Sequence, residues 1–453
     1  MAAPPVFGEL GLSIIGLGSQ YPPNELKLDA LETISKRFYP ASPSMAKVLS
    51  INRYTGIDHR SSIGTPDHPV VNQAAAPTIA ELHRVFLTDG VPLAVQASRK
   101  ALAEAGIADP AAITHLVATT CTDSANPGYD HFVAKALGLS PRLEKVLLHG
   151  VGCSGGLAAL RTAANLCLGH AARGLPARAL VVALEVSTTL VRSELDSVHA
   201  RQETRIGVAL FSDGASAVVL SNGRGPAAAA EEPVYDLLGW EHRVVPDTED
   251  DLGFDVDPAG WKVVLSPRVP KLTEAVVRPA WEALMAALPA VALPAADGAR
   301  EPSVFDWAMH PGGATILTGA ERALGITPAH MRASYAIYVG HGNSSSATIF
   351  SVLDRLRAED MDALAPGGRA RAHVVGAAFG PGIAVEMCML RRNLHRGRVG
   401  AVPAGLQTPP ETESDVSSSR GDEGGGDEGG EATAAGSREH VFVSEALDRL
   451  ELD

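Results

Sequence analysis

Short apolar runs alternate with segments of helical periodicity along most of this chain. Unbroken apolar runs of about four to eight residues are typical of strands buried on both faces, whereas an apolar residue every third or fourth position predicts a helix. The predicted strands are Leu12–Leu17, Ile113–Thr119, Val146–Leu148, Leu180–Glu185, Ile206–Phe211, Ala215–Ser221, Phe305–Met309, His373–Ala378 and Ile383–Leu390. The predicted helices are Val91–Glu104, Pro127–Leu137, Leu157–Leu168, Leu272–Ala287 and Thr315–Leu324. This alternation predicts an α/β protein.

The pattern divides into two halves and a tail. The Gly-, Pro- and Ala-rich segment Asn222–Pro233 predicts a surface loop, and a second α/β series begins at Tyr235. We therefore expect one half over residues 1–234 and another over 235–398. Residues 399–453 are rich in Ser, Gly, Asp and Glu. Such a segment buries too little apolar area to offset its chain entropy, so we predict a disordered acidic tail.

Charge and cysteine usage narrow the functional classes. The net charge is −14, but residues after position 400 contain thirteen acidic residues against three arginines. The rest is nearly neutral, so we expect no nucleic-acid partner. The four cysteines have no paired spacing, which favours a reducing compartment, the cytoplasm. Without a signal peptide or a long apolar run, we expect no membrane association. The histidines form no HExxH pair, and we expect neither a metal site nor a cofactor.

The segment Gly150-Val151-Gly152-Cys153-Ser154-Gly155-Gly156 carries the first candidate for chemistry. The pattern places Cys153 at a turn between a strand and a helix. Backbone N–H groups and the dipole at a helix N-terminus favour a thiolate, which is the nucleophile in many acyl-transfer enzymes. A buried cysteine that only fills space is the alternative for this residue taken alone.

His310 and Asn343 follow in two similar settings. His310 ends an apolar run and precedes Pro-Gly-Gly and a helix, and Asn343 follows the segment Tyr338–Gly342. We predict a strand end before Asn343 and a helix from Asn343 to about Arg357. Ligands bind at the carboxyl ends of strands in open α/β sheets, so the three residues are expected to converge. A loop histidine and a helix N-cap are the alternatives for each residue alone.

A converging Cys, His and Asn can perform carbon–carbon bond formation. The thiolate is loaded with an acyl group from a thioester, while His and Asn donors stabilise the negative charge that develops on a carbonyl oxygen. An enolate formed by decarboxylation of a malonyl thioester needs the same donors. A Cys-His-Asn peptidase is the rival, but the surroundings of Cys153 lack the Cys-Gly-Ser-Cys-Trp pattern of papain-like enzymes.

At this point the motifs resemble those of type III polyketide synthases, and most closely their fungal branch. The resemblance rests on the segment around Cys153, on Ala209–Ala215, on His310-Pro-Gly-Gly, on Gly342-Asn343-Ser-Ser-Ser-Ala and on Gly376–Ile383. It extends from about Leu10 to Arg392. It implies a thiolase fold with two similar αβαβα halves in a five-layered core, a homodimer, acyl-CoA and malonyl-CoA as substrates, and a Cys153–His310–Asn343 triad.

The resemblance also implies further site residues. Phe211 would be a gatekeeper ring between the CoA tunnel and the cavity, and Val263 would replace a second gatekeeper Phe. The small residues expected to line the cavity are Cys121, Ser187 and Ser345. The basic residues expected to contact CoA phosphates are Lys47, Arg53 and Arg60.

The implied activity is iterative condensation of malonyl-CoA onto a medium- or long-chain fatty acyl starter held on Cys153. Cyclisation would then give alkylresorcylic acids, alkylresorcinols or alkylpyrones. Two alternatives remain open from the sequence. One is a β-ketoacyl synthase of the KAS III type, which condenses once, and the other is a binding protein that keeps the fold as a scaffold.

Overall fold

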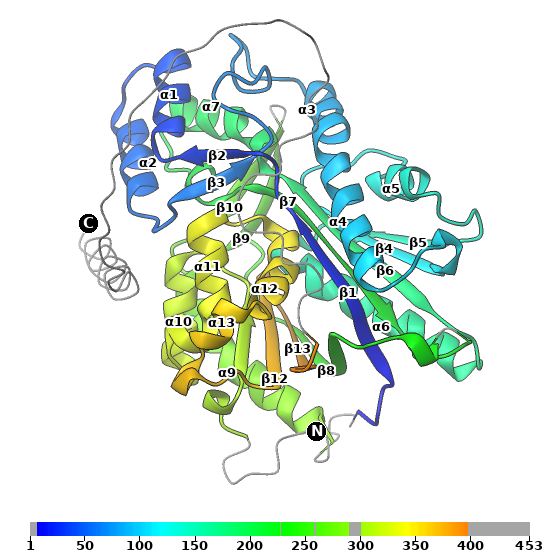
Figure 1. The fold of residues 1–453 in the computed structure, drawn as a ribbon. Helices are drawn as coiled ribbons and strands as arrows, with labels where there is room; N and C mark the ends of the chain where they lie inside the picture. The colour runs from blue at the N-terminus through cyan, green and yellow to red at the C-terminus, as the bar shows by residue number, and fades with distance from the viewer. Residues whose placement is uncertain (1–6, 227, 258–259, 290–299, 397–453) are drawn as a thin grey trace, which may run out of the picture. The chain divides into compact units, whose positions relative to one another are not determined.

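A large mixed β-sheet dominates the computed structural model, which describes residues 7–226, 228–257, 260–289 and 300–396. Nine strands of the described residues form this sheet in the order β11-β12-β13-β8-β1-β7-β6-β4-β5 (Figure 1). The two halves of the sheet meet where β1 pairs antiparallel with β8 through Leu12 and Leu237. The acidic tail predicted over residues 399–453 lies outside the described residues.

The strands of the first half are β1 (Leu12–Gln20), β2 (Asn24–Lys27), β3 (His59–Ser62), β4 (His115–Thr119), β5 (Glu144–Leu148), β6 (Arg178–Val186) and β7 (Asp213–Ser221). Its helices are α1 (Asp29–Phe38), α2 (Pro43–Arg53), α3 (Ile79–Val85), α4 (Val91–Glu104), α5 (Tyr129–Leu137), α6 (Gly155–Ala172), α7 (Val191–Arg201) and α8 (Gly207–Leu210).

The strands of the second half are β8 (Tyr235–Val244), β9 (Leu252–Asp257), β10 (Gly260–Leu265), β11 (Asp306–Met309), β12 (His373–Gly380) and β13 (Ala384–Arg392). Its helices are α9 (Val269–Ala287), α10 (Ala314–Leu324), α11 (Arg332–His341), α12 (Thr348–Leu356) and α13 (Glu359–Ala363). Strands β9 and β10 form a separate hairpin, as do β2 and β3.

Alternation of side chains along the strands builds five layers. In β6, Val181 packs into a central cluster that contains helices α6 and α12, while Val182 packs outward against α4 and α5. In β12, Val374 joins the same central cluster, while Val375 packs outward against α9 and α10. Both halves of the sheet are thus covered on two faces, which explains their nearly unbroken apolar strands. The predicted five-layered αβαβα core is confirmed.

Two of the predicted strands are wrong. The segment 206–211 contains the short helix α8 (Gly207–Leu210) instead of a strand, and the segment before Asn343 is the end of helix α11. Short apolar runs do not distinguish a strand from a buried helical turn, because both bury every residue. The helix predicted from Asn343 begins later, with a 3₁₀ turn at Ser345–Ala347 followed by α12.

None of the described helices combines the length and the apolar character that crossing a bilayer requires.

Candidate active site

Cys153 lies between β5 and α6, as the sequence predicts, in a single 3₁₀ turn at Gly152–Ser154. Glycines let the start of α6 approach the segment that follows Asn343. A Cβ atom on Gly156 would lie 2.5 Å from the carbonyl oxygen of Ser346, so any larger residue would push these segments apart. The Gly-Gly pair after Cys153 therefore brings the nucleophile close to the second half of the fold.

His310 follows the last residue of β11 and is held through its backbone. Its N–H donates to the carbonyl oxygen of Ala377 in β12, at 2.7 Å. The side chain is 1% exposed, and neither ring nitrogen has a hydrogen-bond partner among the described residues. Buried polar groups nearly always form hydrogen bonds. An imidazole with no such bond at either nitrogen therefore indicates a group that binds or acts on a substrate.

Asn343 is fixed by both its backbone and its amide. It forms a bridge with Phe211, in which the Asn343 N–H donates to Leu210 and its carbonyl oxygen accepts from Ser212. Its Oδ1 accepts from the Ser345 N–H at 2.8 Å, and its Nδ2 donates to the Gly312 carbonyl oxygen at 3.3 Å. The Nδ2 group keeps a second proton, which neither of these two bonds uses.

Asn343 links the segments that carry the other two candidates. The side chains of Ser345 and Asn343 both interact with the Cys153 thiol. The Nδ2 of Asn343 also donates to the carbonyl oxygen of Gly312, two residues after His310. Asn343 therefore contacts both the thiol and the segment that contains the imidazole, although the three residues are far apart in the sequence.

Burial controls the protonation of this site. Burial raises the pKa of Cys153 to about 11, although Ser345 and Asn343 lower it. Burial also lowers the pKa of His310 to about 3. Both groups are therefore neutral near pH 7, which differs from the thiolate that the helix N-terminus led us to expect. Loss of solvation around the thiol outweighs the helix dipole here.

A buried carboxyl group, that of Glu185, interacts with the thiols of Cys121 and Cys153. The sequence analysis did not identify it. Glu185, at the end of β6, is 0% exposed and accepts from the Cys121 N–H at 3.1 Å and from the Thr122 hydroxyl at 3.0 Å. Burial raises its pKa, while hydrogen bonds from Ser346 and Cys121 lower it. The signal in the sequence was an acidic residue at the end of a predicted apolar strand.

A cavity of about 410 Å³ opens above Cys153. Four residues expected from the sequence line it: Cys121, Phe211, Val263 and Ser345. The sequence analysis missed its aromatic wall, which consists of Phe254 and Trp261 on the β9–β10 hairpin. An aromatic residue on each side of a Pro- and Gly-containing turn could have indicated that hairpin.

Phe211 and Val263 also line a second, smaller cavity of about 40 Å³. Ser187 lines this smaller cavity and is absent from the lining of the larger one. The two gatekeeper candidates therefore form a wall between two spaces, and Ser187 lies behind that wall.

The three basic candidates lie in different environments. Lys47 is exposed on α2, and Arg53 is exposed and forms an ion pair with Glu32 at 2.9 Å. Arg60 is only 5% exposed and donates to Asn52 at 2.8 Å and to the Ala209 carbonyl oxygen at 3.1 Å. The placement of Arg60 differs from the surface position expected of a CoA-phosphate contact, and it suits a residue that ties α2 to α8.

A thiol at the wall of a cavity, with an amide in contact with it and an imidazole, unpartnered within the described residues, in the same half of the fold as that amide, is an arrangement suited to acyl transfer. Comparison with protein-family models agrees. Residues 49–225 match the N-terminal domain of chalcone and stilbene synthases, and residues 237–393 match their C-terminal domain. The chain belongs to this family, and it is a type III polyketide synthase.

Individual relatives lie in the fungal branch. The acylalkylpyrone synthase csyB of Aspergillus oryzae is 41% identical over 84% of this chain and 94% of its own length. The type III polyketide synthase pspB of Penicillium soppii is 42% identical over 84% of this chain and 96% of its own. A crystal structure of a type III pentaketide synthase from Neurospora crassa superposes with a TM-score of 0.82 at 70% identity, covering 84% of this chain and all of that one. CsyB complexed with CoA-SH superposes with a TM-score of 0.80 at 40% identity, with the same coverage.

Proposed function

We propose that this enzyme condenses malonyl-CoA repeatedly onto a fatty acyl starter held as a thioester on Cys153, and then cyclises the product. The observation that carries the proposal is the buried imidazole of His310, which has no hydrogen-bond partner among the described residues and whose segment is bonded to the same Asn343 that contacts the Cys153 thiol. The relative bound to CoA-SH supports CoA thioesters as substrates, and the relative named acylalkylpyrone synthase supports an alkylpyrone product. Alkylresorcylic acids and alkylresorcinols are the other products considered.

Loading begins from two neutral groups. As the starter carbonyl reaches Cys153, the thiol gives its proton to a free nitrogen of His310 and the sulfur attacks the carbonyl carbon. The free amide proton of Asn343 donates to the oxygen that becomes negative. The tetrahedral intermediate collapses, CoA leaves as a thiolate, and His310 returns the proton to it.

Extension uses the same donors. Loss of CO₂ from malonyl-CoA leaves an enolate, whose oxygen accepts hydrogen bonds from Asn343 and from the protonated nitrogen of neutral His310. The enolate carbon attacks the acyl carbonyl and displaces the Cys153 sulfur as a thiolate, which takes up one proton from solvent. The product is a β-ketoacyl-CoA thioester. Its acyl group returns to Cys153 as in the loading step, in which the bond to CoA breaks and CoA leaves, and another cycle begins.

The cavity supports an apolar starter. Its volume of about 410 Å³ falls in the range of ordinary ligand pockets, and Leu252, Phe254, Trp261 and Val263 make much of its wall apolar. Each methylene group changes discrimination by only about 1–3 kcal/mol, so we expect several chain lengths to be accepted.

The test is to incubate the pure protein with acyl-CoA esters of increasing length and ¹³C-labelled malonyl-CoA. Mass spectrometry counts the extensions, and fragmentation separates pyrones from resorcylic acids and resorcinols. Cys153→Ala is the inactive variant, and Cys167→Ala, a buried thiol in the core, is the matched control. Products with a single extension in every reaction would instead support a β-ketoacyl synthase.

We also propose that the enzyme acts as a homodimer in the cytoplasm. The similarity of both halves to dimer-forming type III polyketide synthases supports the first part. Analytical ultracentrifugation at several protein concentrations would detect the dimer, and a single monomeric species at all of them would exclude it.

A further inference from the structure

Three potential metal ligands meet at the end of the first half that lies away from Cys153. They are His115 at the start of β4, Glu144 at the start of β5 and His170 in the last turn of α6. Nε2 of His115 and Nε2 of His170 each lie 3.8 Å from a carboxylate oxygen of Glu144. One ligand atom from each residue falls within 4.8 Å of the others. In Figure 1 these strands and this helix lie side by side.

The hydrogen bonds of Thr114 favour one tautomer of His115. The Thr114 hydroxyl oxygen lies 3.0 Å from the Arg178 carbonyl oxygen, to which it donates, and it accepts from the Arg178 N–H. Its third contact is 2.7 Å to Nδ1 of His115, where the role of each atom depends on the tautomer of the ring. With the hydroxyl proton on the Arg178 side, Nδ1–H of a neutral His115 donates and the lone pair lies on Nε2.

That Nε2 atom is buried and unpaired. The His115 side chain is 0% exposed, and Nε2 has no hydrogen-bond partner among the described residues. A buried acceptor without a donor is costly, because it has lost water and gained nothing in return. It faces the carboxylate of Glu144, which also offers only lone pairs when ionised.

His170 presents the same arrangement from the helix. Its Nδ1 lies 3.4 Å from the Pro176 carbonyl oxygen, which can only accept, so Nδ1 carries the proton of the neutral ring. Its Nε2 lone pair then faces Glu144. An outer hydrogen bond from the second ring nitrogen is the usual way in which proteins orient histidine ligands of metals.

We propose that His115, Glu144 and His170 form a binding site for a divalent metal ion of the zinc class. Two imidazole nitrogens and a carboxylate are ligands that Zn²⁺ accepts, with water in a fourth position. Ligand atoms around tetrahedral Zn²⁺ lie about 3.4 Å apart. The two 3.8 Å contacts to Glu144 therefore have to shorten by about 0.4 Å, and a pair at the 4.8 Å limit by about 1.4 Å. Glu144, whose side chain is 62% exposed, can move towards the metal, and the two imidazoles have to approach each other as the metal binds.

The placement indicates a structural role. Glu144 opens β5 and His170 ends α6, and Cys153 lies in the turn that joins these two elements. Helix α6 rises about 1.5 Å per residue, so His170 lies roughly 22 Å from the start of the helix beside Cys153. A metal ion here would clamp the edge strand β5 to α6 without touching substrate.

Sequence spacing could not reveal this site. His115, Glu144 and His170 come from three separate elements and match no short metal motif. The expectation that the chain binds no metal was based on such motifs alone. Parallel pairing places His115 and Glu144 opposite each other, and packing of α6 adds His170.

Calorimetric titration with Zn²⁺ tests the proposal on the full chain after chelator treatment. The variants are Glu144→Gln and His170→Ala, with His131→Ala as the matched control because His131 is an exposed histidine on α5. Wild type and His131→Ala should bind one equivalent more tightly than the two ligand variants by at least about tenfold. Zn²⁺ should also raise the melting temperature of wild type and leave that of the ligand variants nearly unchanged.

Two further arms identify the binding site. Cys153→Ala should keep the tight equivalent, which separates this cluster from the active-site thiols. Bound Co²⁺ should give the visible absorption of a four-coordinate ion, and Glu144→Gln should abolish it. Equal Zn²⁺ affinity in wild type and both ligand variants would overturn the proposal, as would the absence of Zn²⁺ binding by wild type. The melting temperatures of the metal-free variants reveal any that are unfolded.

Discussion

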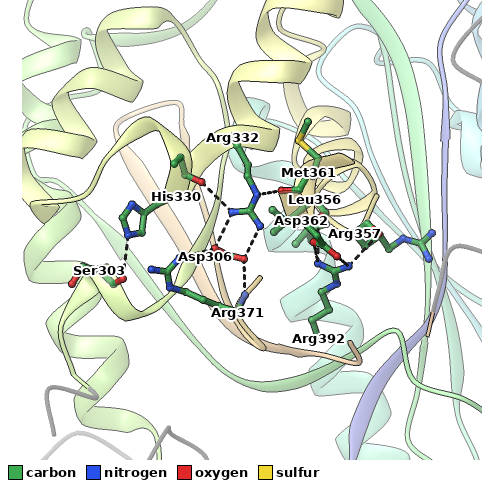
Figure 2. A network of polar contacts seen from close by, with 12 residues as sticks. Ser303, Asp306, His330, Arg332, Leu356, Arg357, Met361, Asp362, Arg371 and Arg392 are labelled. Carbon is green, nitrogen blue, oxygen red and sulfur yellow. Dashed lines mark hydrogen bonds and ion pairs between the residues drawn. The ribbon is translucent and has the colours of Figure 1, made fainter. Parts of the chain in front are cut away.

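The two ends of strand β11 show opposite ways of burying a polar side chain. At its start, Asp306 is 0% exposed and accepts from both terminal nitrogens of Arg332, at 2.9 and 2.8 Å (Figure 2). The Arg371 backbone N–H adds a third bond at 3.2 Å. Just beyond its end, His310 is equally buried, yet its ring has no partner among the described residues.

The ion pair at the start of β11 helps to position His310 at its other end. Asp306 begins β11, which delivers His310, and Arg332 begins α11, which leads to Asn343. The ion pair thus joins the starts of two elements whose other ends lead to side chains with proposed catalytic roles. Arg332 also donates to the Met361 carbonyl oxygen, which ties in helix α13 (Figure 2). Polar groups that hold the fold are satisfied within the protein, whereas those that act on substrate are left open.

The largest expected effect comes from breaking the paired end. Arg332→Met leaves the Asp306 carboxylate buried with a single weaker cationic partner, so stability should fall by about 3–5 kcal/mol. Denaturant unfolding followed by the fluorescence of Trp307, which lies on β11 itself, measures the change.

Two controls sharpen this test. Arg355→Met breaks the ion pair with Asp360 on the surface, and it should cost less than about 1 kcal/mol. The double variant Asp306→Leu with Arg332→Met removes both buried charges and should recover much of the loss. A double variant as unstable as Arg332→Met would show that packing, and not an uncompensated charge, explains the effect.

The second effect concerns the open end. His310→Gln should reduce condensation by about 10²–10³-fold, because it removes the base and one donor to the developing oxyanion. The same change should not lower stability near pH 7, since the ring makes no hydrogen bond among the described residues. Initial rates of ¹³C-malonyl incorporation and the unfolding midpoint are measured on the same preparation. A variant that loses stability and activity in parallel would contradict this contrast.

The same contrast explains which features of the site the sequence could predict. The positions of Cys153 and His310 at strand ends followed from local patterns, since a strand, a glycine turn and a helix are encoded by neighbouring residues. The pairing of Asp306 with Arg332 could not be predicted, because the two are joined only by the packing of α11 on β11. The protonation of Cys153 was predicted wrongly for the same reason. Its local helix favours a thiolate, but burial by the second half of the fold decides otherwise.

A third effect is the loss of folding stability at acidic pH that His310 causes. The pKa of His310 is lowered to about 3 in the folded protein, against about 6.5 in an unfolded chain. Unfolded protein therefore binds the proton first, and stability should fall as the pH drops from about 6.5 towards 3. Between pH 6.5 and 4 the contribution of His310 is about 3 kcal/mol.

Comparison with His310→Gln isolates this contribution. The variant lacks the titrating group. Between pH 6.5 and 4 its free energy of unfolding should therefore fall by about 3 kcal/mol less than that of wild type. Urea unfolding at pH 6.5, 5.5 and 4 measures both proteins. Parallel losses in the two would mean that His310 is charged, or solvated, in the folded state.

The smallest expected effect concerns Arg371, the second arginine beside Asp306 at the start of β11. Arg371 is partly exposed, and its side chain reaches Asp306 at only 3.4 Å, whereas its backbone N–H is closer. Arg371→Ala keeps the backbone bond and leaves Arg332 in place, so the loss should be about 1 kcal/mol or less. Arg369→Ala, an exposed arginine two residues earlier, is the matched control. If Arg371→Ala costs as much as Arg332→Met, the carboxylate depends on the summed charge of both arginines. A small loss instead means that the two-pronged bond from Arg332 alone suffices to keep Asp306 buried, and with it the base of the strand that carries His310.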